Sequence, residues 1–199
     1  MATFSLRHMS VLYVGDKGVG KTSMILSTCH NDFFEHDVPQ IQCNHHSIHN
    51  NQIIAHVDSN DSTISKMSDI YADVIVLMFS IVDRKSLDSL EEKWLRILDQ
   101  PSLKNIPIII VGNKCDLRGR DGNCLSQAEC LQSVTRIEAL AYMEYSGKTQ
   151  SGLHDYLDSL VMAYVNPVQL ITPRPRRRIR RDQPTICTKR SLKITCFQS

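Results

Sequence analysis

Residues 15–23, "GDKGVGKTS", decide how this chain is interpreted. Their glycines and Lys-Thr pair form the spacing Gly15-x-x-x-x-Gly20-Lys21-Thr22, which lies between a short apolar run and a segment of helical character. Small residues let backbone N–H groups close around phosphate oxygens, and the N-terminus of the following helix adds partial positive charge. The pattern therefore predicts a phosphate-binding loop. The alternative is a glycine turn before an unrelated helix.

The residue types in this loop assign expected roles. Lys21 is expected to reach the β- and γ-phosphates, and the Thr22 hydroxyl is expected to ligate Mg²⁺. Lys17 is unusual, because a long charged side chain stands where the chain passes close to phosphate. The loop residues expected to bind the nucleotide are Gly15, Lys17, Gly18, Val19, Gly20, Lys21, Thr22 and Ser23.

Strand-like apolar runs alternate with helix-like amphipathic runs along the chain. We expect strands at 10–15, at 72–81, at 106–112, at 141–147 and, as a pair joined at Asn50-Asn51, within 44–58. We expect helices at 21–29, 86–100, 126–141 and 153–165. This alternation predicts an α/β fold with a doubly wound, mainly parallel sheet that binds ligands beyond the carboxyl ends of its strands.

Two helix details sharpen this prediction. Trp94 and its flanking leucines recur at helical spacing, which indicates packing on a helix face rather than a binding platform. Ser126 and Glu129 have the spacing of a capping box at the start of a helix.

Composition limits the class of protein. The hydrophobic fraction of 42% supports a real core, and no apolar run approaches the roughly 20 residues that cross a membrane. The N-terminus lacks the small-residue cleavage site of a signal peptide, so we expect a first strand there. Seven scattered cysteines indicate reduced thiols in the cytosol.

Asn113-Lys114-Cys115-Asp116 directly follows the strand-like run "IPIIIVG". An ionised Asp only accepts hydrogen bonds, and guanine offers two adjacent donors on its pairing edge whereas adenine offers an acceptor at N1. A fixed Asp116 at the end of a strand therefore favours guanine. Alone the motif is weak and fits a surface loop, but the upstream phosphate loop strengthens it.

Residues 10–165 resemble a small GTPase of the Ras superfamily, of the Rho and mitochondrial Rho (Miro) type. The resemblance rests on "VGDKGVGKTSMILS", "NDFFEHDVP", "ADVIVLMFSIVDRKSLDSLEEKW", "IPIIIVGNKCDLR" and "RIEALAYMEYSGKT". It implies a P-loop NTPase fold with a six-stranded sheet, bound GTP or GDP, and Mg²⁺. By the resemblance, the residues that hold or flank guanine are Asn113, Lys114, Asp116, Ser146, Gly147 and Lys148.

The switch regions depart from the pattern of this family. The resemblance implies a Mg²⁺-binding Thr where Gln40 stands, and Gly-Gln where Asp61 and Ser62 stand, although Asp58 is kept for the Mg²⁺ site. Lys17 occupies a position that is usually Gly, beside the attacking water. These departures lie at the γ-phosphate end, so we expect nucleotide binding with slow or absent hydrolysis and name no catalytic residue.

Lys17 and Asp61 are expected to flank the γ-phosphate site. Lys17 either offsets the repulsion between Asp61 and phosphate or pairs with Asp61 and occupies the site. The second arrangement favours GDP or a fixed switch. The third interpretation is that both side chains are simply exposed at the surface.

A histidine-rich segment raises the question of a metal. It contains Cys43, His45, His46 and His49. Their spacing fits no ordinary zinc site, and alternate strand residues face opposite ways. A degenerate switch loop is the favoured interpretation.

The segment 167–199 is rich in proline and arginine and is expected to be an extended tail after a GTPase domain at 1–166. It has nine Lys and Arg residues against one Asp, so its charge is +8; since the whole chain has +2, the rest has −6. Cys196, four from the final Ser199, fits a prenylation box, and the basic residues supply the second signal that a single lipid needs. The alternatives are a solvated tail, a nuclear-import run and an RNA-binding run. The segment lacks interleaved aromatic residues, which argues against binding of nucleic acid.

These features together predict a monomeric, cytoplasmic signalling protein that associates peripherally with an anionic plasma membrane or endomembrane, or with the mitochondrial outer membrane. Its expected partners are effectors at the switches, exchange factors and GTPase-activating proteins, and no nucleic acid. Three hypotheses about its function remain: a working GTPase switch, a nucleotide-locked scaffold without catalysis, and a truncated paralogue that folds poorly.

Overall fold

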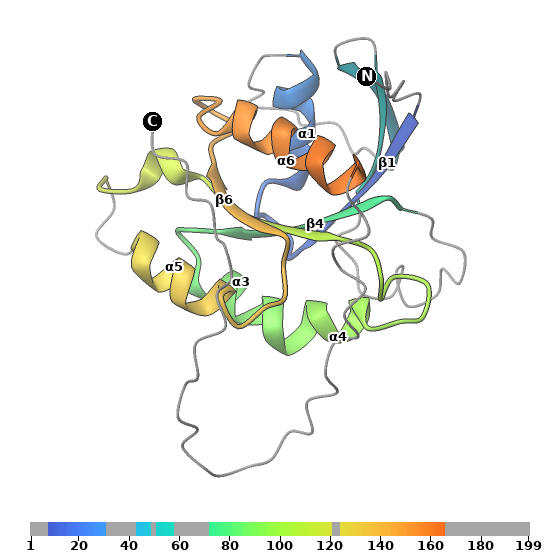
Figure 1. Ribbon diagram of the computed structural model, residues 1–199. Helices are drawn as coiled ribbons and strands as arrows, with labels where there is room; N and C mark the ends of the chain where they lie inside the picture. The colour runs from blue at the N-terminus through green and yellow to red at the C-terminus, as the bar shows by residue number, and fades with distance from the viewer. Residues whose placement is uncertain (1–7, 31–42, 49–50, 58–71, 121–123, 166–199) are drawn as a thin grey trace.

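The structure is a computed structural model that describes residues 8–30, 43–48, 51–57, 72–120 and 124–165. Six strands form one sheet in the order β2-β3-β1-β4-β5-β6 (Figure 1). They are β1 (His8–Gly15), β2 (Cys43–Ile48), β3 (Asn51–Val57), β4 (Val74–Ser80), β5 (Ile108–Asn113) and β6 (Ala141–Tyr145). Only β2 and β3 pair antiparallel among these strands, which confirms the predicted mainly parallel sheet and its hairpin.

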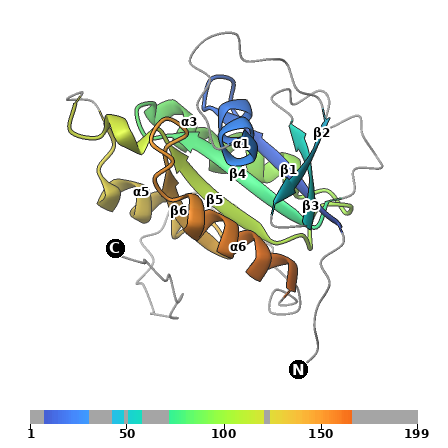
Figure 2. The ribbon, with the colours of Figure 1, turned by 90° about the horizontal axis from the view of Figure 1, so that it is seen from above.

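Helices cover both faces of the sheet. The helical elements are α1 (Lys21–His30), α3 (Arg84–Ser89), the π turn η1 (Leu90–Trp94), α4 (Leu95–Leu98), the 3-10 turn η2 (Cys115–Leu117), α5 (Gln127–Val134) and α6 (Leu153–Val165). Figures 1 and 2 show α1 and α6 on one face and α3, α4 and α5 on the other, so the fold is doubly wound. Within the described residues, no helix combines the length and apolarity needed to cross a membrane.

Strand β4 lies at the centre of two apolar cores. All seven of its residues are buried, as its continuous apolar run predicts. Alternate side chains face opposite ways, so Val74, Val76 and Met78 join the core under α1 and α6. Ile75, Leu77 and Phe79 join the other core, which contains Trp94. Packing on both faces therefore fixes β4 at the centre of the sheet.

The helix predicted at 86–100 is one helical stretch from Arg84 to Leu98 with a π turn in its middle. It begins two residues early because the Asp83 side chain accepts a hydrogen bond from Lys85 N and caps it. Trp94 is fully buried, which confirms the predicted packing.

The helix predicted at 126–141 is wrong at its C-terminal end. Its start is confirmed, because Ser126 and Glu129 form a reciprocal capping box. However, α5 ends at Val134, and a tight turn in which Ile137 N donates to Val134 O follows it. Leu140 N then donates to Ile108 O, which brings the chain into the sheet beside β5. Sheet pairing therefore overrides the helical spacing.

The strand register brings four loops to one edge of the sheet. Gly15 of β1 lies opposite Met78 of β4, Ser80 lies opposite Asn113 of β5, and Asn113 lies opposite Tyr145 of β6. These residues end, or nearly end, their strands, so the chain leaves the sheet at the same carboxyl edge each time. That edge is where parallel α/β sheets bind ligands.

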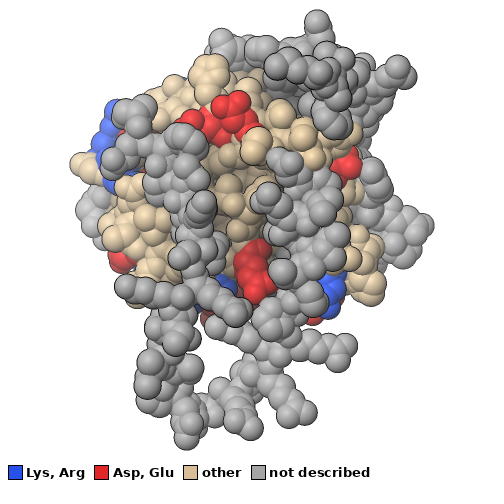
Figure 3. Space-filling view, in the orientation of Figure 1, with Lys and Arg blue, Asp and Glu red and all other residues tan. Residues whose placement is uncertain are grey.

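The described surface seen in Figure 3 shows acidic side chains in several separate groups rather than one continuous field.

Candidate nucleotide-binding site

The predicted phosphate loop connects β1 to α1 and has close contacts that only glycine permits. A Cβ atom added at Gly15 would lie 2.3 Å from the Met78 carbonyl oxygen, and one added at Gly20 would lie 2.3 Å from Asn113 Nδ2. Gly20 also has a φ of +96°, in a region that other residues rarely adopt. The glycines are thus required for the loop to pass against β4 and β5.

Lys21, the first residue of α1, lies inside the loop. Its ammonium Nζ donates to the carbonyl oxygens of Gly15 and Asp16, both at 2.7 Å. Its side chain is buried, with 5% exposed. A buried cation that is held by neutral carbonyls, at the N-terminus of a helix, fits the binding of an anion.

The other loop residues differ in their exposure. Thr22 and Ser23 follow it in the first turn of α1 and are half-buried, whereas Lys17 and Gly18 are exposed. The three interpretations given for Lys17 and Asp61 all remain predictions. Asp61, its proposed partner, and Asp58, the second proposed Mg²⁺ ligand, lie outside the described residues, as do Gln40 and Ser62.

The base-recognition motif begins at the last residue of β5 and is tied to the phosphate loop. Asn113 Nδ2 donates to the Val19 carbonyl at 2.9 Å, and its Oδ1 accepts from Lys114 N at 2.8 Å. Lys114 has a left-handed φ of 67°, and its Nζ donates to the Gly18 carbonyl at 2.8 Å. Two side chains of one loop therefore fix the backbone of the other.

Asp116 is held by the loop after β6. Ser146 Oγ donates to Asp116 Oδ1 at 2.6 Å and accepts from Thr149 N at 3.1 Å. Ser146 and Gly147 are buried, and Lys148 is exposed. The structure thus brings together the three segments that sequence analysis assigned to one site, namely 15–23, 113–116 and 146–148.

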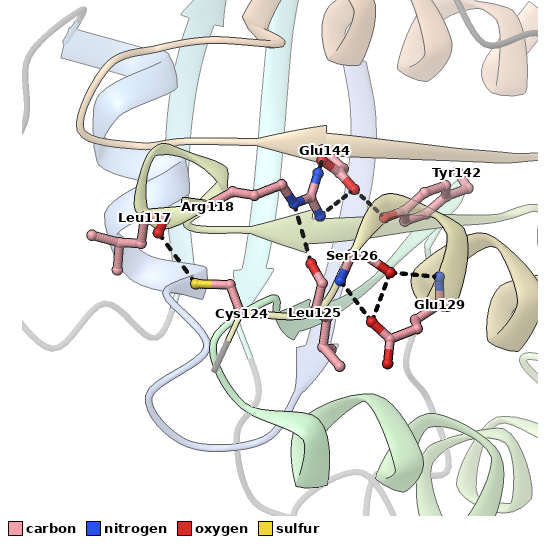
Figure 4. Close-up of polar contacts among 8 residues, drawn as sticks. All are labelled: Leu117, Arg118, Cys124, Leu125, Ser126, Glu129, Tyr142 and Glu144. Atoms are coloured by element: carbon pink, nitrogen blue, oxygen red, sulfur yellow. Dashed lines mark hydrogen bonds and ion pairs between the residues drawn. The ribbon is translucent and has the colours of Figure 1, made fainter. Parts of the chain in front are cut away.

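A network that sequence analysis missed supports the base-recognition loop from behind (Figure 4). Arg118 forms a two-pronged ion pair with Glu144 of β6, and its Nε donates to the Leu125 carbonyl at 3.1 Å. Tyr142 OH donates to Glu144 Oε1 at 2.9 Å. The only feature of the sequence that could have indicated this network is that Arg118 follows Asp116, the end of the base-recognition motif, by two residues.

Ionisation of this network is fixed by its surroundings. The hydrogen bonds to Glu144 raise the pKa of Arg118 and outweigh the opposing effect of burial. Burial, with the charge of Glu144, raises the pKa of Tyr142, so its hydroxyl stays protonated as a donor. Burial also raises the pKa of the Cys115 thiol within the motif. Arg118 therefore stays charged, and Tyr142 and Cys115 stay neutral, near neutral pH.

Asp16, an unassigned position of the loop pattern, is a second feature that sequence analysis missed. Its carboxylate accepts hydrogen bonds from Ser89, Lys93 and Trp94 of the 84–98 helix. Burial acts to raise the pKa of Asp16, but these hydrogen bonds and the charge of Lys93 lower it below its ordinary value.

The histidine-rich segment gives no described metal site. The side chains of Cys43, His45 and His46, and all of His49, lie outside what the structure describes. Across the residues that it does describe, no group of three or more His, Cys, Asp or Glu side chains could hold a metal ion.

Comparison with known proteins assigns the family. A sequence model of the Ras family matches residues 10–166. The chain belongs to the Ras family. This Ras-family chain is 37% identical over 116 residues to Mitochondrial Rho GTPase 1 of Cryptococcus neoformans var. neoformans serotype D, in both strain JEC21 and strain B-3501A. The matched segment is 55% of this chain and 17% of each relative, so the chain spans only a small part of their length.

The match confirms a small GTPase of the Ras superfamily, similar to the Rho and mitochondrial Rho branch, with the α/β fold of P-loop NTPases. Binding of guanine nucleotides is general in this family. Within the matched range lie all three segments of the site described above.

Proposed function

We propose that this Ras-family protein binds GDP and GTP with Mg²⁺, hydrolyses GTP slowly, and signals at a membrane surface. The observation that supports nucleotide binding best is the set of hydrogen bonds that joins the phosphate loop to the base-recognition loop through Asn113 and Lys114. A nucleotide has a phosphate end and a base end, and these contacts fix the two binding segments relative to each other.

The residues fit a guanine nucleotide at both ends. Lys21 and the loop amides are proposed to hold the β- and γ-phosphates, with Lys17, Gly18 and Val19 lining the loop. Asp116, oriented by Ser146, is proposed to accept the two adjacent donors of guanine. Lys114 is proposed to lie along the base, beside Gly147 and Lys148.

Thr22 and Asp58 are proposed to hold Mg²⁺. Hydroxyl and carboxylate oxygens are the ligands that this cation prefers. When bound, Mg²⁺ would supply positive charge that offsets the charge of the phosphates. Thr22 follows Lys21 in the first turn of α1, at the loop where phosphate is expected.

Slow hydrolysis is proposed from the residues around the γ-phosphate. Hydrolysis depends on positioning and on stabilisation of developing charge. Gln40, Asp61 and Ser62 replace the residues that do this in the family pattern, and Lys17 adds a side chain beside the attacking water. Bound GTP is therefore proposed to stay uncleaved for long periods.

A nucleotide-locked scaffold is the alternative function, supported by the same replacements. Effectors, exchange factors and GTPase-activating proteins are proposed partners in either case. The basic tail, with a charge of +8, is proposed to associate with anionic lipids at the plasma membrane, an endomembrane or the mitochondrial outer membrane.

Titration of the purified protein with fluorescent GDP, competed with unlabelled GDP or ADP, tests the proposed binding. We expect GDP to compete and ADP to fail, and Asp116→Asn to weaken GDP binding because its amide presents a donor to guanine donors. Equal competition by ADP would contradict guanine recognition, and no binding would favour a poorly folded paralogue.

Single-turnover GTP hydrolysis separates the two functions. Slow hydrolysis that cell extract accelerates supports a switch, and none under either condition supports a scaffold. Nucleotide extracted from the purified protein then identifies the resting state, and mostly GTP would exclude a GDP-locked form.

A further inference from the structure

Three donors from one helical stretch hold the carboxylate of Asp16. Ser89 Oγ donates to Oδ2 at 2.5 Å, Trp94 Nε1 donates to Oδ1 at 2.9 Å, and Lys93 Nζ donates to Oδ1 at 3.1 Å. Asp16 is the second residue of the phosphate loop, and these donors follow 73 to 78 residues later. The contacts therefore connect the loop to the 84–98 helix.

The π turn places the three donors on one side of the helix. In a regular α-helix each residue turns by about 100°, so a residue five positions on points away from the first. Leu95 N instead donates to Leu90 O, five residues back. The wider turn brings Trp94, as well as Lys93, to the side that Ser89 occupies, and all three reach Asp16.

The donors are themselves held in place. Trp94 is 0% exposed and packs in the core with Leu90 and Leu98. Lys93 Nζ lies 4.6 Å from the centroid of the Trp94 ring, within the range of a cation–π contact. The Asp16 carboxylate is thus fixed by groups with little freedom to move.

Asp16 in turn contacts the phosphate-binding lysine. Its backbone carbonyl accepts a hydrogen bond from Lys21 Nζ at 2.7 Å, so a displacement of Asp16 moves an acceptor of Lys21. A carboxylate near the phosphate site also repels phosphate unless a cation compensates it. Lys93 supplies that cation at 3.1 Å.

We propose that Ser89, Lys93 and Trp94 are positioning residues of the nucleotide site: through Asp16 they keep the phosphate loop and Lys21 in the arrangement that retains phosphate. This inference rests on the proposed binding of guanine nucleotide. The helix acts on the phosphate end only, so it sets how long the nucleotide stays bound and leaves the preference for guanine over adenine unchanged.

Release of fluorescent GDP from the full-length protein tests this role. Trp94→Phe keeps the ring and removes the N–H, and Lys93→Met keeps the stem and removes the charge. Each is expected to speed release about tenfold, the factor that corresponds to one hydrogen bond to a charged group. Lys93→Arg is expected to retain slow release, and the preference for GDP over ADP is expected to stay as in wild type.

A matched control separates positioning from general destabilisation. Ile137→Val removes one buried methyl group from the turn before β6, at the edge of the sheet opposite the phosphate loop. It is expected to lower stability to a similar extent while GDP release stays within twofold of wild type. Release that is equally fast in Ile137→Val and Trp94→Phe would overturn the proposal.

Trp94 also offers a spectroscopic signature, because it is the single tryptophan of the chain. Addition of GDP is expected to change its emission in wild type but not in Asp16→Ala, which removes both acceptor oxygens. The double variant Asp16→Ala/Trp94→Phe is expected to release GDP no faster than the faster single variant, since both changes break the contact between these two side chains. Wild-type release in Trp94→Phe, multiplying effects in the double variant, or an equal emission change in Asp16→Ala would each overturn the inference alone. Failure of wild type to bind GDP would overturn the proposed function and this inference with it.

Discussion

At the scale of single residues, the contact between Asp116 and Ser146 governs the base end of the site. The two residues come from different strand ends, and a hydrogen bond of 2.6 Å joins them. A carboxylate discriminates between bases only when its oxygens are held in a fixed direction, because its own acceptors are otherwise available to water. Ser146 supplies that restraint while it also caps the turn at Thr149.

Ser146→Ala is therefore expected to weaken GDP binding about tenfold and to reduce the preference for GDP over ADP. A hydrogen bond to a charged group contributes about 1.5 kcal/mol or more, which corresponds to that factor. Titration with fluorescent GDP measures the loss. Ser133→Ala, on α5, is the control and is expected to bind as wild type does. Unchanged affinity in Ser146→Ala would show that the contact does not orient Asp116.

Asp16 gives a prediction of pH dependence. Its pKa is lowered in the folded state from an ordinary value of 3.8, so the stability that its ionised form contributes is fully present above that value. This contribution is lost as the pH falls through the folded pKa. Among the described residues, Lys93 is the charged group that pairs with the carboxylate, and an ammonium group is ordinarily protonated throughout this range.

Asp16→Asn is accordingly expected to be less stable than wild type by the same amount at pH 7 and at pH 5, with the difference shrinking below about pH 4. Urea unfolding at each pH, in the absence of nucleotide, measures it. A difference that grows as the pH falls would contradict the lowered pKa.

At the scale of elements, the sequence predicted strands and helices where a single period dominates. The buried run of β4, the hairpin of β2 and β3, and α6 follow directly from apolar pattern and turn residues. The C-terminal end of α5 was not predicted correctly, because it depends on the hydrogen bond from Leu140 N to Ile108 O in the sheet. The π turn at Leu90–Trp94 was not predicted either, because the Trp94 side chain contacts Asp16, which lies far away in the chain.

The residues of the candidate site also divide into those that the sequence predicted and those that it did not. Backbone geometry requires the glycines, and the chemistry of phosphate and guanine requires Lys21 and Asp116, so motif spacing located them. Arg118 and Glu144 have no such signature, because many residue pairs could brace a loop against a strand. Their roles become visible only when β6 is placed beside β5.

The link between Arg118 and Glu144 gives an element-scale prediction. Their side chains are 30% and 16% exposed, so removing one partner leaves a poorly solvated charge. Arg118→Met is expected to lower the free energy of unfolding by about 2 kcal/mol, less than for a fully buried pair, and to weaken GDP binding. Urea unfolding measures the first effect and nucleotide titration the second.

The double variant Arg118→Met/Glu144→Gln supplies the control. It is expected to be destabilised by less than the sum of the two single variants, because no charge is then left alone in the half-buried site. Strict additivity would show that the two side chains do not interact in solution.

At the scale of the whole molecule, charge is divided between residues 167–199, the expected tail, and the rest of the chain. The tail has nine basic residues and one acidic residue, which leaves a charge of −6 on the remainder of the chain. We therefore propose that an anionic lipid surface attracts residues 167–199 and repels the rest of the chain.

Binding to vesicles tests this division. The protein is expected to bind phosphatidylserine-containing vesicles and not neutral phosphatidylcholine vesicles, and to dissociate in about 1 M salt, where the Debye length falls to about 3 Å. Replacement of five arginines by glutamine is expected to reduce binding at least about a hundredfold, because each contributes about 1 kcal/mol near the surface. The five are Arg176, Arg177, Arg178, Arg180 and Arg181. GDP affinity measured on the same variant is the internal control and is expected to equal that of wild type. Vesicle binding that persists in this variant would mean that the attraction comes from elsewhere in the chain, and the division of charge would then have no role in membrane association.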